Sequence, residues 1–243
     1  NSPRDVNHFL DKGILKTDRL NVRSVKVYAD GALGSRGAAL KEEYSDQHNH
    51  FGAMVTPVAA IEQLAQRIAD SEYQMNTHAI GDKANTVVLD AIASAKLKAR
   101  DHRSRIEHSQ HLLPSDIARF ADLGVIASIQ TIHMSSDRPW AIERLGQERI
   151  ESGAYVWRDL LTADVHIANG TDVPVEPINP VANFYAAVAR KTLQGTPQGG
   201  FEGHQRMTRE ETLKSMTIWN AYAAFEEEET GSIEVGKRAD LTV

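Results

Sequence analysis

Four polar side chains that could bind a metal ion or transfer a proton follow short apolar segments of this sequence: Lys26, His78, His108 and Asp172. Each stands at or near the C-terminal end of a segment that predicts a β-strand. In a parallel α/β barrel every strand opens its carboxyl end onto the same face, and active sites are built there. Two imidazoles on adjacent strands fit a pair of ligands for a divalent metal ion. Together the four residues indicate a metal site, although each alone is a weak signal.

Each of these residues also has a structural interpretation. A single histidine in a strand is more often a hydrogen-bonded core or rim residue than a metal ligand. Asp172 could cap the turn before Pro174, and Lys26 could reach solvent between a barrel and its helices. An unpaired ammonium in a buried strand is costly, however, which counts against a purely structural Lys26.

The neighbouring polar residues are assigned to ion pairs or to the surface. Glu107 precedes His108 in the same strand, so we expect it to face the opposite side and to pair with an arginine. Other histidines lie in polar stretches, and we expect them at the surface: His48, His50, His102 and His111.

Short β-branched or apolar runs alternate with helical periodicity along the chain. Strands are predicted over residues 22–29, 74–80, 105–108, 125–129 and 165–171. Helices are predicted from caps, first-turn prolines and apolar spacing: from Thr56-Pro57, over 84–98, over 114–124, from Pro180 and from the capping box Thr208-x-x-Glu211. Long loops are expected over 30–55 and 131–160, and a mobile surface loop over 194–205.

The fold class is α/β. Five strand–helix alternations imply a parallel sheet with helical crossovers. An open doubly wound sheet and part of a (β/α)8 barrel both fit this pattern. No glycine-rich phosphate loop follows any predicted strand, which disfavours a nucleotide-binding domain.

Composition narrows the class of protein. The 243 residues are 41% hydrophobic and 25% charged, which is typical of one globular domain. A net charge of −6 argues against nucleic acid as a partner, and no stretch approaches the roughly 20 apolar residues of a membrane helix. Because cysteine is absent, a metal would have to be held by histidine, carboxylate or an unusual ligand. The polar N-terminal residues do not resemble a signal peptide, so a cytoplasmic location is expected.

Seven segments carry a resemblance to a known family: VKVYADGALGSRGAAL, THAIGDKANTVVLDAI, RSRIEHSQHL, ASIQTIHMSSD, RLGQERI, NGTDVPVEPINP and GSIEVGKRADLTV. In unbroken order they resemble the amidohydrolase family 3 proteins, the YtcJ-like and N-substituted formamide deformylase-like branch of the amidohydrolase superfamily. The resemblance implies a (β/α)8 TIM barrel with a small β-sandwich made from both chain ends.

The resemblance also implies roles for single residues. Lys26 matches the strand-four lysine that can be carboxylated by CO2 and bridge two metal ions. His78 and His108 match the metal ligands of strands five and six, and Asp172 matches the strand-eight aspartate, a metal ligand and the catalytic acid–base. One or two divalent ions, with zinc expected, are implied as cofactor. Four further residues fall where the family places substrate-binding groups: Gln130, His133, Arg36 and Asp82.

The chain departs from the family on its N-terminal side. Its one His-x-His sequence, His48-Asn49-His50, lies in a polar loop after strand four and does not replace the family's strand-one pair. Barrel strands one to three are also missing. We therefore expect a partial barrel, strands four to eight, over residues 1–228, and a segment 229–243 that begins the β-sandwich with one strand. Five strands cannot close an eight-stranded barrel, so a homo-oligomer, or the missing N-terminal part of the same barrel, is expected as partner.

Two functional hypotheses remain. One is a metal-dependent amidohydrolase that cleaves C–N bonds other than peptide bonds in small linear amides such as N-substituted formamides. The other is a truncated, catalytically inactive relative with a binding or regulatory role. The missing strand-one ligands favour the second hypothesis, whereas retention of Lys26, His78, His108 and Asp172 together favours the first.

Overall fold

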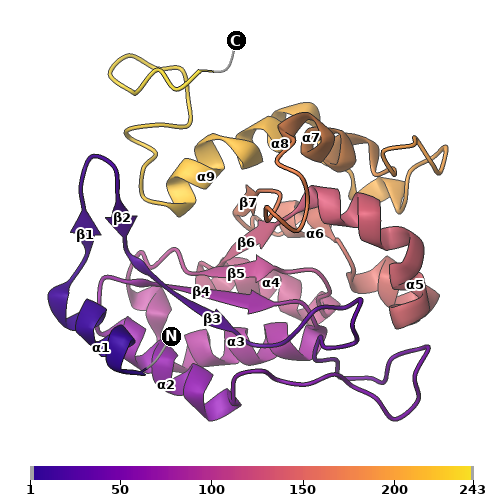
Figure 1. Cartoon of the computed structure of the whole chain (residues 1–243), viewed down its shortest axis with the longest axis horizontal. Helices are drawn as coiled ribbons and strands as arrows, with labels where there is room; N and C mark the ends of the chain where they lie inside the picture. Colours follow the sequence, from indigo (N-terminus) through magenta and orange to yellow (C-terminus); the bar gives the residue numbers. More distant parts are fainter. Residues whose placement is uncertain (1–2, 242–243) are drawn as a thin grey trace.

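A parallel sheet of five strands forms the centre of the molecule, and its spatial order β3-β4-β5-β6-β7 follows the chain (Figure 1). The computed structural model describes residues 3–241. The strands have these bounds: β3 Ser24–Tyr28, β4 Gln74–Ala79, β5 Arg105–His108, β6 Ile126–Ile129 and β7 Ile167–Asn169. All five predicted strands are therefore present, and all neighbouring pairs are parallel.

Helices connect these strands and follow the sheet. They have these bounds: α1 Pro3–Lys12, α2 Val58–Ala69, α3 Asp82–Ser94, α4 Pro114–Leu123, α5 Thr131–Gly153, α6 Trp157–Thr162, α7 Pro180–Ala189, α8 Arg209–Met216 and α9 Ile218–Ala223. Two short 3-10 turns, Leu97–Ala99 and Gly203–Gln205, and a small antiparallel pair, β1 Leu15–Lys16 with β2 Asn21–Val22, complete the described elements. None of the described helices is long and apolar enough to span a membrane.

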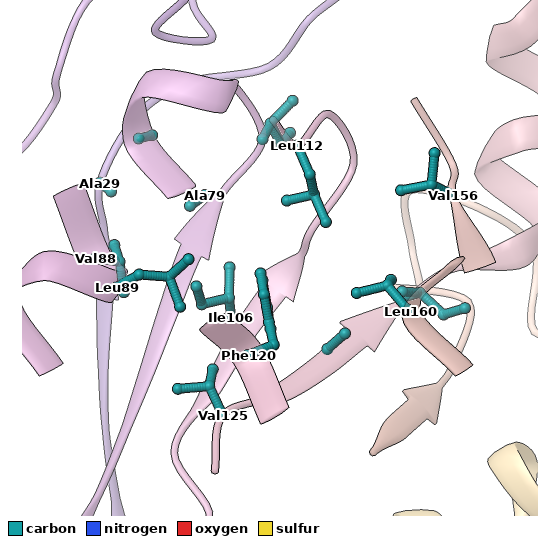
Figure 2. Packing of buried hydrophobic residues seen from close by; sticks show 14 of the residues in the cluster. Ala29, Ala79, Val88, Leu89, Ile106, Leu112, Phe120, Val125, Val156 and Leu160 are labelled. Carbon is teal, nitrogen blue, oxygen red and sulfur yellow. The ribbon is translucent and has the colours of Figure 1, made fainter. Parts of the chain in front are cut away.

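The core lies between the sheet and the helices that cover one face of it. Ile106 on β5 packs in one fully buried cluster with Val88 and Leu89 of α3 and Phe120 of α4 (Figure 2). These side chains come from the apolar stripes that predicted the two helices, so burial of that stripe is what fixes each helix against the strands.

Helix ends follow the local sequence in three of four predicted places. Pro180 starts α7, and the side chain of Asn179 caps it. Pro114 starts α4 and Gly124 ends it in the left-handed conformation, with φ 68°. The capping box of α8 is complete: the Thr208 side chain accepts from the backbone of Glu211, whose side chain accepts in return. Thr56 is not the cap that was predicted, because α2 begins at Val58 and no side chain caps it.

The loop predicted over residues 131–160 is wrong. Most of that segment forms α5, and α6 follows shortly after it. The helical pattern is hidden because Pro139 interrupts it and because Gly146 adopts φ 77° and ψ 166°, which kinks the segment between two helical stretches. The loops over 30–55 and 194–205 are present, with only isolated bridges or a 3-10 turn inside them.

The strand predicted near the C-terminus is not formed in the described residues 229–241, which are turns and irregular backbone. Figure 1 shows this segment running away from the sheet after α9. Ile233 and Val235 are 89% and 108% exposed, since no neighbouring strand offers its backbone or an apolar face to pair with them. The proposed division at residue 228 stays a prediction, and the last two residues lie outside the described part.

Candidate active site

A cavity of about 460 Å³ opens at the carboxyl ends of the strands. Its lining brings together residues that the sequence analysis singled out from four separate elements and one loop: Lys26, His78, His108, His133 and Asp172. Their spacing in the sequence spans most of the chain, so only the parallel sheet order explains why they share one cavity.

His78 and His108 lie against each other inside the cavity. Their ring centroids are 4.5 Å apart and the rings meet edge to face. In the sheet register His78 is paired with Glu107, so regular alternation would turn His108 to the other face. His108 instead adopts φ 79°, a rare conformation for a non-glycine residue, and this ends the alternation at the strand terminus. The backbone thus carries strain where the two imidazoles meet, as functional sites often do.

Each of these two rings has one nitrogen held by a neighbour. Nδ1 of His108 is 2.7 Å from Oε1 of Gln130, whose own amide donates to the carbonyl of Ser128 at 3.3 Å. Nε2 of His78 hydrogen-bonds to the carbonyl oxygen of Gly31 at 3.5 Å and lies 3.5 Å from the carboxylate of Asp30. Within the described residues the other ring nitrogens, Nε2 of His108 and Nδ1 of His78, make no hydrogen bond. This is the arrangement found around metal-binding histidines, where the second nitrogen fixes the ring and its tautomer.

Burial keeps both imidazoles uncharged at neutral pH. It lowers the pKa of His78 to about 4, with the neighbouring His108 as the second cause. Burial also lowers the pKa of His108 to about 4, although the hydrogen bond that the ring donates to Gln130 acts in the opposite direction. A metal ion requires neutral imidazole, so the two side chains are already in the binding form.

Lys26 and Glu107 place opposite charges beside the histidines. Burial lowers the pKa of Lys26, while the charges of Glu107 and Asp172 act in the other direction. Burial is the largest single influence on the pKa of Glu107 and raises it, but the charges of Arg105 and Lys26 and the hydrogen bonds with Ser128 and Arg105 together lower the net pKa.

Arg105 Nε lies 3.1 Å from the Glu107 carboxylate, so the predicted glutamate–arginine pair is present. The prediction that Glu107 faces away from His108 is wrong: Glu107 is paired with His78 in the sheet register, the positive φ of His108 ends the alternation, and the charge of Glu107 acts on His108.

His78 and His108 provide two suitable metal ligands, which is fewer than a complete site requires. Two neutral, oriented imidazoles are suitable ligands for zinc or a similar ion. Among residues 3–241, however, no three histidine, aspartate or glutamate side chains gather closely enough to hold an ion. A third donor must come from Lys26 as a carbamate, from a movement of the exposed Asp172, or from outside the described residues.

Three of the predicted substrate contacts have other partners. Gln130 lines a small neighbouring cavity and holds His108. Arg36 forms an ion pair with Asp46 at 2.8 Å in the long loop. Asp82 accepts from the backbone of Lys41 at 3.0 Å at the start of α3. Neither Arg36 nor Asp82 lines the main cavity, and their substrate contacts stay predictions; His133 does line it.

Sequence reasoning missed Asp30, the buried carboxylate behind His78. It accepts backbone hydrogen bonds from Ala39 at 2.9 Å, Ile80 at 3.0 Å and Gly81 at 2.8 Å. Burial raises its pKa to about 6 despite these bonds. Gly81 is required here, because a Cβ on it would lie 2.0 Å from the carbonyl oxygen of Ala39. The only sequence signal was Asp30-Gly31 after a strand, which looks like an ordinary turn.

Two histidines predicted at the surface are buried, so that prediction was wrong for them. His102 is 2% exposed and bonds the carbonyl of Leu123 at 2.8 Å. His111 is 3% exposed, 4.0 Å from Asp82, and burial lowers its pKa to about 4. Their polar neighbours in the sequence hid them, because α4 and the long helix α5 cover the segments in which they lie. His48 is exposed as predicted, and His50 is half-buried.

The fold and the cavity define a class: a partial α/β barrel with polar residues gathered at the carboxyl ends of its strands. A model of the amidohydrolase family matches residues 4–243. The chain therefore belongs to the amidohydrolase family, as the sequence motifs predicted.

Three similar proteins illustrate the relationship. The chain is 36% identical over 236 residues to Protein LONG AFTER FAR-RED 3 of Arabidopsis thaliana, covering 96% of this chain and 40% of that protein. It is 28% identical over 222 residues to N-substituted formamide deformylase of Arthrobacter pascens, covering 90% of this chain and 40% of that enzyme. An uncharacterized metal-dependent hydrolase of Pyrococcus furiosus superposes with a TM-score of 0.81 at 32% identity, covering 95% of this chain and 47% of the other. The chain thus spans less than half the length of these relatives.

Proposed function

We propose that the protein is a metal-dependent hydrolase that cleaves C–N bonds other than peptide bonds in small linear amides, with N-substituted formamides as first candidates. One observation carries the proposal: His78 and His108 are adjacent, neutral and each fixed through one ring nitrogen. The likeness to N-substituted formamide deformylase supports the choice of substrate.

His78, His108, Lys26 and Asp172 are the residues that would hold one or two divalent ions, with zinc expected. When bound, such an ion supplies water activation at neutral pH and polarisation of the substrate carbonyl. The chain's own contribution begins with orientation: Gln130 holds the ring of His108, and the carbonyl of Gly31 with the nearby Asp30 carboxylate holds the ring of His78. Lys26 would take part as a carbamate, which converts its cation into an anionic ligand.

Asp172 is the proposed acid–base. It lies at the cavity in an exposed position, with φ 55°, and its charge acts on Lys26, His78 and His133. Its carboxylate accepts a proton from the attacking water and returns it to the nitrogen of the leaving amine, which is the dual role that amide hydrolysis requires.

The first experiment measures metal per chain by plasma mass spectrometry, with the intact mass of the same sample. We expect one or two equivalents of zinc or a similar ion in the full-length protein, and loss of metal in His78→Ala and His108→Ala. His48→Ala is the matched control, because His48 lies exposed in the long loop beside Glu43. Absence of bound metal from the wild-type protein would contradict the proposal.

The second experiment separates metal binding from proton transfer. Asp172→Asn should abolish release of amine from N-substituted formamides while the metal content stays close to wild type. Turnover within a few-fold of wild type would remove Asp172 from the acid–base role.

A second candidate is a catalytically inactive relative with a binding or regulatory role. The observation that favours it is the lack of a complete three-ligand group among residues 3–241. A homo-oligomer, or an N-terminal part of the same barrel, would add ligands to the open cavity and favour hydrolysis. Sedimentation of the metal-loaded protein, together with its intact mass, distinguishes these partners.

A further inference from the structure

One part of the cavity lining, here called the corner, carries two carboxylates, Asp137 and Glu176, that form no ion pair in the described part of the chain. Asp137 on α5 and Glu176 in the segment after β7 both line it. Burial and the charge of Glu176 raise the pKa of Asp137 to about 7, so the two groups lie close enough to repel each other. The hydroxyl of Ser136 contacts both side chains. Within residues 3–241 neither carboxylate forms an ion pair, although the nearby Arg138 and Arg190 both pair with Glu202.

A buried histidine in the same corner has an unsatisfied nitrogen. His133 is 8% exposed and lines the cavity beside Asp137. Its Nε2 has no hydrogen-bond partner among the described residues. Such a group is rare in folded proteins unless a ligand or water satisfies it. This observation is independent of the two carboxylates and points to a polar ligand in the same place.

The wall beside this corner is apolar and closely fitted. Trp140 of α5 lies against Gly34, where a Cβ would come 3.1 Å from the indole ring. Leu33 and Val175 complete this part of the lining. An alkyl chain would bury its surface against these side chains, while a charged end group reached the carboxylates.

We propose that Asp137, Glu176, His133 and Trp140 form a subsite for a primary ammonium group carried on a short alkyl stem of the substrate. A cation between the two carboxylates removes their repulsion, and it can donate to Nε2 of His133 when that ring is neutral. The inference rests on the proposed amide hydrolysis and narrows its substrate class to linear amides that bear a second amine, such as mono-acylated diamines.

The test compares two probes of nearly equal shape in calorimetric titrations of the full-length protein. N-acetyl-1,4-diaminobutane carries the ammonium group, and N-pentylacetamide replaces it with a methyl group. At a pH about one unit above the pKa of Asp137, we expect the cationic probe to bind about tenfold more tightly. Added salt should reduce that preference.

Substitutions test whether the preference for the cationic probe arises from Asp137 and Glu176. Asp137→Asn combined with Glu176→Gln should bring the two affinities together, and the conservative changes keep the shape of both side chains. Glu62→Gln on α2 removes an exposed carboxylate outside the lining and should leave the preference intact. Equal affinity for the two probes in the wild type, no binding of the cationic probe, or a preference that persists in the double variant would each overturn the subsite.

Amide cleavage measured on the same samples keeps the two proposals apart. Selective binding of the cationic probe without its cleavage contradicts the hydrolysis and supports the subsite. Cleavage of both probes with equal kcat/KM supports the hydrolysis and overturns the subsite.

Discussion

Two carboxylates have very different surroundings: Asp137 lines the cavity, whereas Asp30 is buried beneath its lining. Asp30 stands behind His78 and accepts three backbone N–H groups. Asp137 lies on α5, where the hydroxyl of Ser136 is hydrogen-bonded to it and the charge of Glu176 acts on it. Burial is the largest cause of a raised pKa in both, to about 6 for Asp30 and about 7 for Asp137.

The difference indicates that Asp30 stabilises the fold, whereas Asp137 is available to bind a ligand. The bonds of Asp30 run within the chain and join the loop after β3 to the start of α3, so its negative charge is compensated before any ligand arrives. Asp137 is not compensated by the described part of the chain. A carboxylate that lines a cavity without a compensating charge is typical of a binding site, because a ligand can supply the missing positive charge or hydrogen-bond donor.

The largest effect is expected from removing the compensated carboxylate. Asp30→Ala leaves three buried backbone N–H groups without an acceptor, so it should lower the free energy of unfolding by about 3–5 kcal/mol. Urea denaturation followed by circular dichroism measures this change. Asp70→Ala, at the exposed end of α2, is the control and should cost far less. A loss at Asp30 no larger than that of the control would break the comparison.

An effect of intermediate size is expected at Gln130, because its side chain accepts the hydrogen bond that orients His108. Gln130→Ala removes the acceptor that holds Nδ1 of His108, and metal affinity should fall about 10–100-fold. Competition with a chelating dye measures the dissociation constant. Gln63→Ala on the exposed face of α2 should leave it unchanged. Unaltered affinity in Gln130→Ala would show that His108 needs no second contact to bind metal.

Most lining residues at the ends of the strands could be predicted from the sequence, and few of those on α5 could. Alternating apolar residues located β3 to β5, and the rule that parallel strands open on one face brought His78 and His108 into one cavity. Lys26 and Asp172 reached the same cavity by that argument. The family motifs added His133, which also lines it.

The rest depends on contacts between segments far apart in the chain. The acceptor role of Asp30 joins it to residues about ten and fifty positions away, which no local pattern records. Pro139 and Gly146 hid α5, and with it the helix that carries Asp137 and Trp140. The positive φ of His108 is set by the packing at the strand end, since propensity disfavours it.

A smaller effect of opposite sign is expected at the uncompensated carboxylate. The pKa of Asp137 rises from 3.8 to about 7 on folding, so the folded protein favours the protonated form and loses stability as pH rises between about 4 and 7. Asp137→Asn should therefore stabilise the metal-free protein by about 1–2 kcal/mol above pH 7 and have little effect near pH 4. Urea midpoints across this pH range measure it. A destabilised variant at high pH would show that a cation of the chain already pairs with Asp137.

The smallest effect is expected at Arg36, which the family resemblance placed among the substrate contacts. Its guanidinium pairs with Asp46 in the long loop and does not line the cavity, so Arg36→Ala should change KM for a cleaved amide less than about twofold. Steady-state kinetics measure this. A tenfold rise in KM with unchanged kcat would mean that the long loop brings Arg36 over the cavity when substrate binds. The long loop, which Asp30 holds through the backbone of Ala39, would then also contact the substrate. The contrast between Asp30 and Asp137 would hold only for the ligand-free protein.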